Sequence, residues 1–170
     1  GIVYDPNLKP QNTRSYELGA DISFFNNLVS INYTYSRQNV KDQIFEVPLA
    51  SSTGSSSFMT NGGKIHTNAH ELTVNINPIR LKNVDWNIGI NWSKIDNYVD
   101  ELAPGVESIF LGGFTTPQVR AGIGDKFPVI YGVSYARDDN GNLIVDEDGV
   151  PMAGKDDVIG KVSPDFILGF

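Results

Sequence analysis

Apolar and polar residues alternate along the first part of the chain. The apolar residues fall on every second position, at Tyr16, Leu18, Ala20, Ile22 and Phe24. Polar or small residues fill the positions between them, at Ser15, Glu17, Gly19, Asp21 and Ser23. A period of two residues predicts a β-strand with one apolar and one polar face.

The same alternation resumes after Asn26 and Asn27. Its apolar positions are Val29, Ile31, Tyr33 and Tyr35. Asparagine tolerates the positive φ angles of a two-residue type I′ turn, so the two asparagines predict a tight hairpin. That turn would place Phe24 opposite Val29, and the turn and the pattern then agree on one register.

A second hairpin repeats this design further along the chain. Its apolar positions are Leu72, Val74, Ile76, Trp86, Ile88, Ile90 and Trp92. A five-residue connection over residues 79–83 would place Ile76 opposite Trp86. In that register Leu72 would lie opposite Ile90, and the apolar faces again coincide.

Each apolar stripe is about nine residues long, close to the roughly 9 to 11 residues with which a tilted strand crosses a bilayer. Aromatic residues lie near the ends of the stripes. A membrane barrel is therefore a candidate, although the chain holds no run of about 18 apolar residues that would predict a transmembrane helix.

The connections between the predicted strands alternate in length. Residues 26–27 and 79–83 predict short turns, whereas a Ser/Gly-rich loop over residues 50–63 and a very long irregular stretch over residues 95–164 follow the other strands. Within the long stretch, residues 138–151 predict a small strand pair between Asn-Gly and Asp-Gly turns. Short turns on one side and long loops on the other are typical of outer-membrane barrels.

Composition narrows the possible functions. The formal net charge is -7, and the basic residues are scattered, so the chain lacks the footprint of a nucleic-acid-binding protein. The chain has no cysteine, which excludes disulfides, thiolate metal sites and a cysteine nucleophile. No nucleotide-binding or nucleophile-elbow motif occurs, so we expect no enzyme activity and no cofactor.

Two features invite a metal hypothesis. His66 and His70 are spaced as in the zincin motif, but the glutamate after the first histidine is missing, and residues four apart on a strand lie roughly 13 Å apart. The acidic segment from Asp138 to Asp148 lacks the glycine and glutamate of an EF-hand loop. Rim histidines and a solvated hairpin are the favoured interpretations, and a cation at the hairpin is the open alternative.

Several segments resemble the SusC/RagA family of TonB-dependent outer-membrane transporters. The lead-in DPNLKPQNTRSYELGAD, the strand pair around FFNN and YTYSRQNVKDQI, and the later segments GKIHTNAHELTVN, WNIGINWSKIDNYVDEL and RAGIGDKFPVIYG carry the resemblance, together with VIGKVSPDFILGF. These segments follow one another in the family's order over essentially the whole chain.

The resemblance implies an all-β fold, an antiparallel meander that forms part of a 22-stranded transmembrane barrel in the outer membrane of a Bacteroidetes-type Gram-negative cell. We expect residues 1–170 to be a partial barrel domain, without the plug domain and the C-terminal strand. The expected strands cover residues 14–26, 28–47, 64–78, 84–98 and 164–170. The implied activity is nutrient import, with an oligosaccharide as the expected substrate.

The implied partners are a SusD-like surface lipoprotein, the lipid of the outer membrane and, through the plug alone, TonB. Five aromatic residues of the long loops are candidates for contacts with substrate or lid: Phe58, Phe110, Phe114, Tyr131 and Tyr135. The same rings could instead hold the loops onto one another. The polar face could line a lumen through Glu17, Asp21, Asn32, Thr34, Glu71, Asn75, Asn87 and Asn91.

A second hypothesis is a secreted soluble all-β module that binds carbohydrate or acts as an adhesin. In such a module the apolar stripes would pack against a second sheet rather than face lipid. The two hypotheses therefore differ in where the apolar stripes lie.

Overall fold

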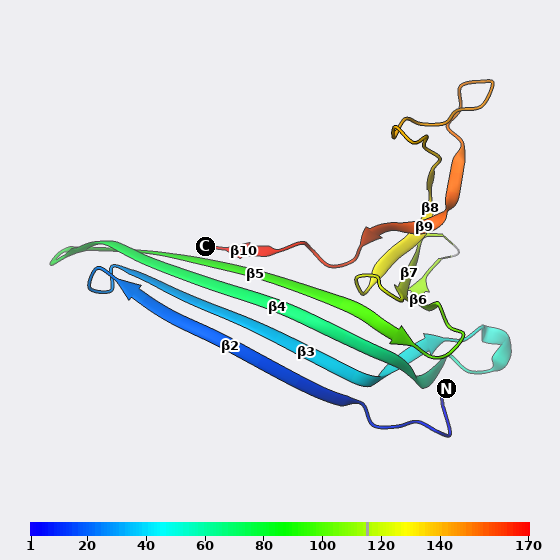
Figure 1. Cartoon of the computed structure of the whole chain (residues 1–170), viewed down its shortest axis with the longest axis horizontal. Coiled ribbons are helices and arrows are strands. Elements are labelled where there is room, and N and C mark those ends of the chain that lie inside the picture. Colours follow the sequence, from blue (N-terminus) through cyan, green and yellow to red (C-terminus); the bar gives the residue numbers. More distant parts are fainter. Residues whose placement is uncertain (115) are drawn as a thin grey trace.

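The computed structural model describes residues 1–114 and 116–170, which form two antiparallel sheets, with one parallel pair at the N-terminus (Figure 1). The strands are β1 (Ile2–Tyr4), β2 (Asn12–Phe24), β3 (Val29–Pro48), β4 (Ser57–Leu81), β5 (Val84–Leu102), β6 (Ser108–Gly113), β7 (Gln118–Gly122), β8 (Val129–Tyr135), β9 (Ala153–Lys161) and β10 (Ile167–Gly169). A single 3-10 turn covers Ser51–Thr53 among these residues. None of the described residues forms a helix long and apolar enough to span a membrane.

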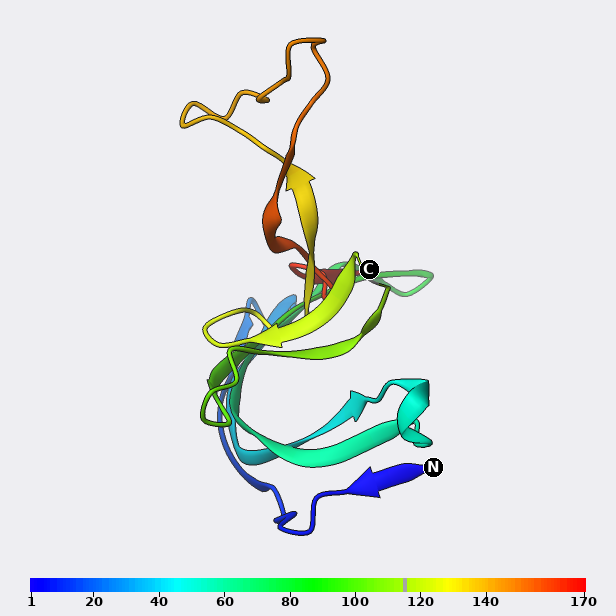
Figure 2. The ribbon, with the colours of Figure 1, turned by 90° about the vertical axis from the view of Figure 1, so that its right-hand side faces the viewer.

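The larger sheet has the order β10-β5-β4-β3-β2, and β1 pairs with the start of β4. Its long strands lie side by side and curve together, as the end-on view in Figure 2 shows. The sheet does not close, so the all-β antiparallel prediction of a partial barrel is confirmed.

The first hairpin forms as the sequence predicts. Phe24 lies opposite Val29, and the N–H of Leu28 donates to the carbonyl oxygen of Phe25 at 3.1 Å. Phe25, Asn26 and Asn27 all have positive φ angles, 52°, 53° and 62°. The loop therefore differs from a plain two-residue turn at Phe25, but the positive φ angles of the two asparagines and the register they predict are confirmed.

The register predicted for the second hairpin is wrong by two residues. Ile76 lies opposite Ile88, and Leu72 lies opposite Trp92. The strands continue to Leu81 and Val84, and a bulge between Ile76 and Ile79 places one additional residue in β4. Pro78 in the bulge has no N–H to give to the sheet, which explains why the pairing is interrupted there. A shift of two residues leaves every side chain on its predicted face.

The predicted long loops are largely strand. Residues 57–63 of the Ser/Gly-rich segment belong to β4, so its irregular part is short. The stretch over residues 95–164 contains the end of β5 and the second sheet, ordered β6-β7-β8-β9. The prediction of a structureless stretch was wrong because its strands are short and interrupted by glycine and proline, which hides their period. Residues 138–151 form two successive turns with isolated bridges instead of a regular strand pair.

The second sheet packs on the larger sheet at the end away from the hairpin turns. The buried core there consists of Phe45, Ile65, Val99, Leu102, Ile109 and Ala121. Ile65 and Val99 lie opposite each other. They are on the same side of the sheet as the polar residues of the long strands, but further from the hairpin turns. The second sheet therefore covers the polar face, not the apolar face.

The apolar face of the long strands stays uncovered in this chain. Leu18 is 73% exposed and Ile22 is 48% exposed, and Trp86 is 53% exposed. None of the alternating apolar residues of the two hairpins belongs to the buried core of the described chain. A soluble sandwich would bury this face, so the arrangement contradicts the soluble-module hypothesis.

Candidate functional site

The second sheet presents one face to the core and the other away from it. Ile109 lies opposite Ala121, and both are buried. Their neighbours Phe110 and Arg120 also lie opposite each other, on the other face of the sheet. On this face Val129, opposite Arg120, is buried, whereas Phe110, Arg120 and Tyr131 are half-buried, so a ligand would contact the second sheet beside those three residues.

Phe110, Arg120 and Tyr131 form a small aromatic and cationic surface, which we call the Arg120 patch. The guanidinium carbon of Arg120 lies 5.3 Å from the centroid of the Tyr131 ring. Its Nη1 donates to Oε1 of Gln118 at 3.4 Å, and Gln118 lies opposite Tyr131. The hydroxyl of Tyr131 donates to the carbonyl oxygen of Asp156 at 3.1 Å, which fixes the ring against β9.

Arg120 carries donor groups that the surrounding protein does not use fully. Its Nε is buried and, in the part of the chain that the structure describes, has no hydrogen-bond partner. A buried donor without an acceptor costs about 1 to 3 kcal/mol, and a ligand oxygen that reached this N–H would recover that cost. A guanidinium beside aromatic rings can bind a carboxylate while a ring stacks on a sugar or side chain.

The structure joins two of the five predicted aromatic residues in this patch, Phe110 and Tyr131. Phe58 lies in the larger sheet, opposite Val47, and is half-buried. Phe114 is 80% exposed just beyond β6, and Tyr135 lies at the far end of β8. No ring contact joins any two of the five within residues 1–114 and 116–170.

Arg120 is the residue that the sequence-based prediction missed. The signal is present in the segment Gln118-Val119-Arg120-Ala121-Gly122, where the arginine alternates with two apolar residues. That alternation predicts a short strand whose arginine points away from the apolar side.

The predicted lumen-facing residues share the polar face of the larger sheet. Asp21 accepts a hydrogen bond from the Asn32 side chain, and Thr73 donates to Oδ1 of Asn91 at 3.0 Å. Register places these four residues in one row across β2, β3, β4 and β5. The row forms a hydrogen-bonding surface of carboxylate, amide and hydroxyl groups across the full width of the long hairpins.

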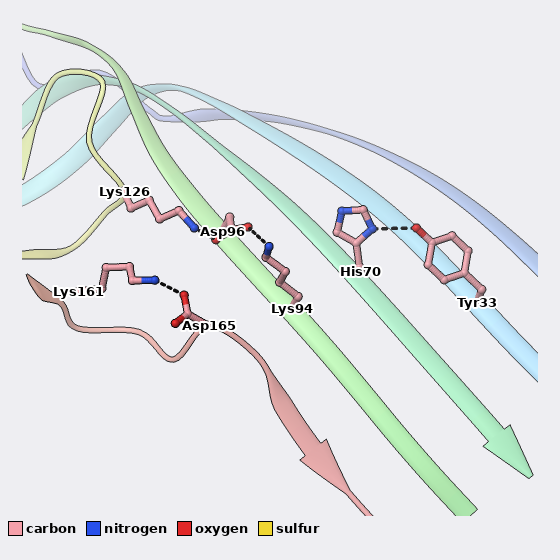
Figure 3. Close-up of polar contacts among 7 residues, drawn as sticks. All are labelled: Tyr33, His70, Lys94, Asp96, Lys126, Lys161 and Asp165. Carbon is pink, nitrogen blue, oxygen red and sulfur yellow. Dashed lines mark hydrogen bonds and ion pairs between the residues drawn. The ribbon is translucent and has the colours of Figure 1, made fainter.

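The two histidines lie on the opposite face from that row and have separate partners. His70 Nδ1 lies 2.7 Å from the hydroxyl oxygen of Tyr33, and the Tyr35 ring lies 5.0 Å away (Figure 3). His66 stacks on Tyr98 and contacts Asp100 at 2.6 Å. Each ring is held by its own aromatic neighbour, in line with the rim interpretation.

The acidic hairpin uses its carboxylates to hold its turns. The N–H groups of Asn140 and Asn142 donate to Oδ1 of Asp138 at 2.9 and 2.8 Å. The hydrogen bond from the Asn142 side chain and those from the backbone hold the pKa of Asp138 below its usual value. Among the described residues, no three His, Asp or Glu side chains are grouped in a way that could hold a metal ion.

Comparison with known proteins agrees with this geometry. Residues 1–157 match the family described as TonB dependent receptor-like, beta-barrel. The chain belongs to this family. Members of this receptor family form β-barrels of the outer membrane and are not enzymes.

The receptor segment also resembles individual members of the family. It is 26% identical to TonB-dependent receptor P3 of Formosa agariphila over 96% of its length, and 28% identical to TonB-dependent receptor P26 of the same organism over all of it. Its fold matches the structure of the RagAB peptide transporter with a TM-score of 0.71 at 18% identity, over 94% of the segment. The predicted resemblance to the SusC/RagA transporters is confirmed.

The segment spans 19% of the length of each of these relatives and of the matched RagAB chain. It therefore corresponds to about a fifth of a whole receptor.

Proposed function

We propose that the chain forms part of the barrel wall of an outer-membrane importer that takes up nutrients with energy from TonB. The uncovered apolar face of β2 to β5 carries this proposal, because lipid is the environment that such a face requires. In this role the polar face lines the lumen, and the second sheet lies inside the extracellular end of the wall.

The residues at which the apolar stripe ends on β2 and on β5 support this placement. On β2 the last aromatic residue is Tyr16, which register places in one row with Asp96 of β5. On β5 the uninterrupted apolar stripe ends at Trp92, four residues before Asp96, and Tyr98 lies on the same face beyond these charged positions. The end of the stripe thus shifts by four residues, at about 3.3 Å per residue, across the three strand spacings of about 4.8 Å from β2 to β5. That shift corresponds to a strand tilt of about 40°. Strands of transmembrane barrels tilt by roughly 35 to 45°.

The hairpin turns then face the periplasm and the long connections face the outside. This arrangement assigns the Arg120 patch to the extracellular half of the lumen, where an arriving substrate first meets the receptor. A surface lipoprotein of the SusD type is the proposed partner above it, and the plug that contacts TonB would come from another part of the receptor.

The proposed substrate is an oligosaccharide or a peptide that carries a carboxylate. The aromatic rings of the Arg120 patch favour sugar stacking, and the guanidinium favours an acidic group. The RagAB structure is described as a peptide transporter, so a peptide with a free C-terminus is a substrate of the same chemistry.

Growth of the native bacterium tests this function. The strain is supplied in turn with acidic oligosaccharides, neutral oligosaccharides or short peptides. A strain without the receptor should lose growth on one of these three classes. Arg120→Gln should reduce uptake of the carboxylate-bearing substrate by roughly 10- to 100-fold, since a hydrogen bond to a charged group contributes about 1.5 to 3 kcal/mol. Lys155→Gln, which removes a charge from β9 outside the patch, is the control.

Normal growth of the deletion strain on every one of these nutrients would contradict the import function. Unchanged uptake by the Arg120→Gln receptor would contradict the role of the patch alone. Localisation gives a separate measure, because the intact receptor should remain in the outer-membrane fraction and require detergent for extraction.

A further inference from the structure

Charged residues on the long strands are sorted by sign between the two faces. Over residues 14–24, 29–39, 66–76 and 86–98 the lysines and arginines are Arg14, Arg37 and Lys94, and all three share the face of the apolar stripes. Three of the four acids in the same ranges, Glu17, Asp21 and Glu71, lie on the polar face. The apolar face therefore has an excess of positive charge.

The fourth acid, Asp96, is neutralised where it lies. Its carboxylate accepts a hydrogen bond from Lys126, which reaches it from the segment beside β5, and it forms a 3.6 Å ion pair with Lys94 (Figure 3). Asp165, which is paired with Lys161, lies close enough to interact with Lys94 and Lys126, so three bases and two acids meet beside β5 and one positive charge is left over. We call Arg14, Arg37, Lys94 and Lys126 the cation band.

The other two members of the cation band have no acidic partner. Arg14 and Arg37 form no ion pair within residues 1–114 and 116–170, and both are exposed. Arg37 contacts the side-chain oxygen of Asn39 at 3.3 Å. Their charges are therefore free to bind an anion.

The members of the band converge on one row of the sheet. Register aligns Arg37 of β3, Asn68 of β4 and Asp96 of β5. Adjacent strands lie about 4.8 Å apart, so Arg37 from one side and Lys94 and Lys126 from the other can reach an anion above Asn68. The next rows toward the hairpin turns carry Tyr35, Leu72 and Trp92, which form an apolar and aromatic surface beside the cation band.

We propose that the cation band binds the phosphate-bearing headgroup of a lipid in the outer leaflet, with its acyl chains on Tyr35, Leu72 and Trp92. Charge complementarity selects this occupant, since the site combines unpaired bases with an adjoining lipid-facing surface. The inference rests on the proposed membrane placement. That placement sets the cation band at the level of the lipid headgroups, just beyond the end of the apolar stripes.

The test uses the intact receptor, purified in detergent, and native mass spectrometry with added lipid. The probes are phosphorylated lipid A and the same lipid A after enzymatic removal of its phosphates. We expect the wild-type receptor to bind the phosphorylated form preferentially. Arg37→Gln with Lys94→Gln should weaken that binding by about 30-fold, since each base near a charged lipid surface contributes roughly fivefold.

Matched variants separate local charge from net charge. Lys82→Gln with Lys155→Gln removes two charges outside the band and should leave lipid binding unchanged. Arg14→Gln with Arg37→Gln removes the two unpaired bases and leaves the Asp96 pairs intact, so it replaces the first variant if that one does not fold. Heat-modifiable electrophoretic mobility reports folding for each receptor.

Equal binding of the two forms of lipid A would overturn the proposal, as would wild-type affinity in a folded band variant. Association of receptor copies in place of lipid binding, lost in the same variant, would assign the band to a protein interface and also overturn it. Failure of the proposed function would be distinguishable from failure of the lipid site. A receptor absent from the outer-membrane fraction would contradict the membrane placement itself, whatever lipid it binds.

Discussion

The ring of Phe45 lies directly over Gly62, where a Cβ atom would come within 1.9 Å of the ring carbon Cδ2. The same Cβ would lie 3.1 Å from the side chain of Ile109 in the second sheet. Glycine at this position thus lets the two sheets approach each other, and their contact depends on the missing side chain.

Gly62→Ala should destabilise the contact between the sheets by about 1 to 3 kcal/mol, because overpacking forces the Phe45 ring or the backbone to move. Thermal unfolding of the intact receptor in detergent measures the effect. Gly112→Ala is the control, since nothing lies within 4 Å of a Cβ built there. A Gly62→Ala receptor as stable as this control would contradict the described packing.

Ile90 and Asn91 are neighbours on β5 that point to opposite faces of the larger sheet. Ile90→Arg should impair folding into the membrane by about 2 to 4 kcal/mol, the range for arginine on the lipid side near the bilayer midplane. Asn91→Arg should be tolerated, since its side chain faces water. The folded fraction of each variant after refolding into lipid vesicles measures the difference, and equal fractions would argue against lipid on the apolar face.

The register of the second hairpin can be tested with cysteine pairs, because the chain contains no cysteine of its own. Cysteines at positions 76 and 88 should be cross-linked by a short bis-maleimide reagent, since Ile76 lies opposite Ile88. Cysteines at 76 and 86 should react several-fold less. The reverse preference, read from electrophoretic mobility in a receptor without other cysteines, would restore the register that the sequence predicts.

The turn held by Asp138 should depend on pH. Its hydrogen bonds hold the pKa of Asp138 below the ordinary value, so the ionised carboxylate stabilises the turn above about pH 4. This stabilisation is lost as the pH falls through the lowered pKa. Amide hydrogen exchange at Asn142, corrected for intrinsic rates, should be several-fold faster in Asp138→Ala than in the wild type at pH 6.

The two receptors should exchange Asn142 at similar rates below pH 3, where the wild-type carboxylate is protonated. Asp139→Ala is the matched control, because the backbone N–H groups of the turn donate their hydrogen bonds to the carboxylate of Asp138. A difference between Asp138→Ala and wild type that is the same at both pH values would contradict the role of the ionised carboxylate.

The sequence predicts the faces of the long strands better than it predicts their ends. Alternation assigns Ile22 and Ile31 to one face because the period of two residues persists through both strands. The bulge beside Pro78 inserts one residue into β4 and so changes the phase of the alternation between Ile76 and Ile79. This single phase change does not show how far the two strands continue toward the turn. Register across such a hairpin is set by pairing energies beyond the turn, which hydrophobic pattern alone does not report.

The second sheet and the Arg120 patch were harder to predict, for a different physical reason. β6 and β7 are short, and their stability comes from packing on Phe45 and Val99, which are far away in sequence. Local pattern carries little information about such contacts. Phe110 and Tyr131 were identifiable as candidates from their type, whereas their convergence on Arg120 required the fold.

The edge of β5 is shared between two distant parts of the chain. β10 pairs with residues 91–93, while backbone hydrogen bonds join residues 124–127 to Asn97 and Val99 further along the same edge. The polypeptide between β5 and β10 thus leaves the sheet and re-enters it at adjoining positions. Insertions and deletions over residues 138–151, which lie outside the buried core, therefore need not alter how the strands on either side of this detour align, so a loop that meets ligand can change while the strand order stays the same.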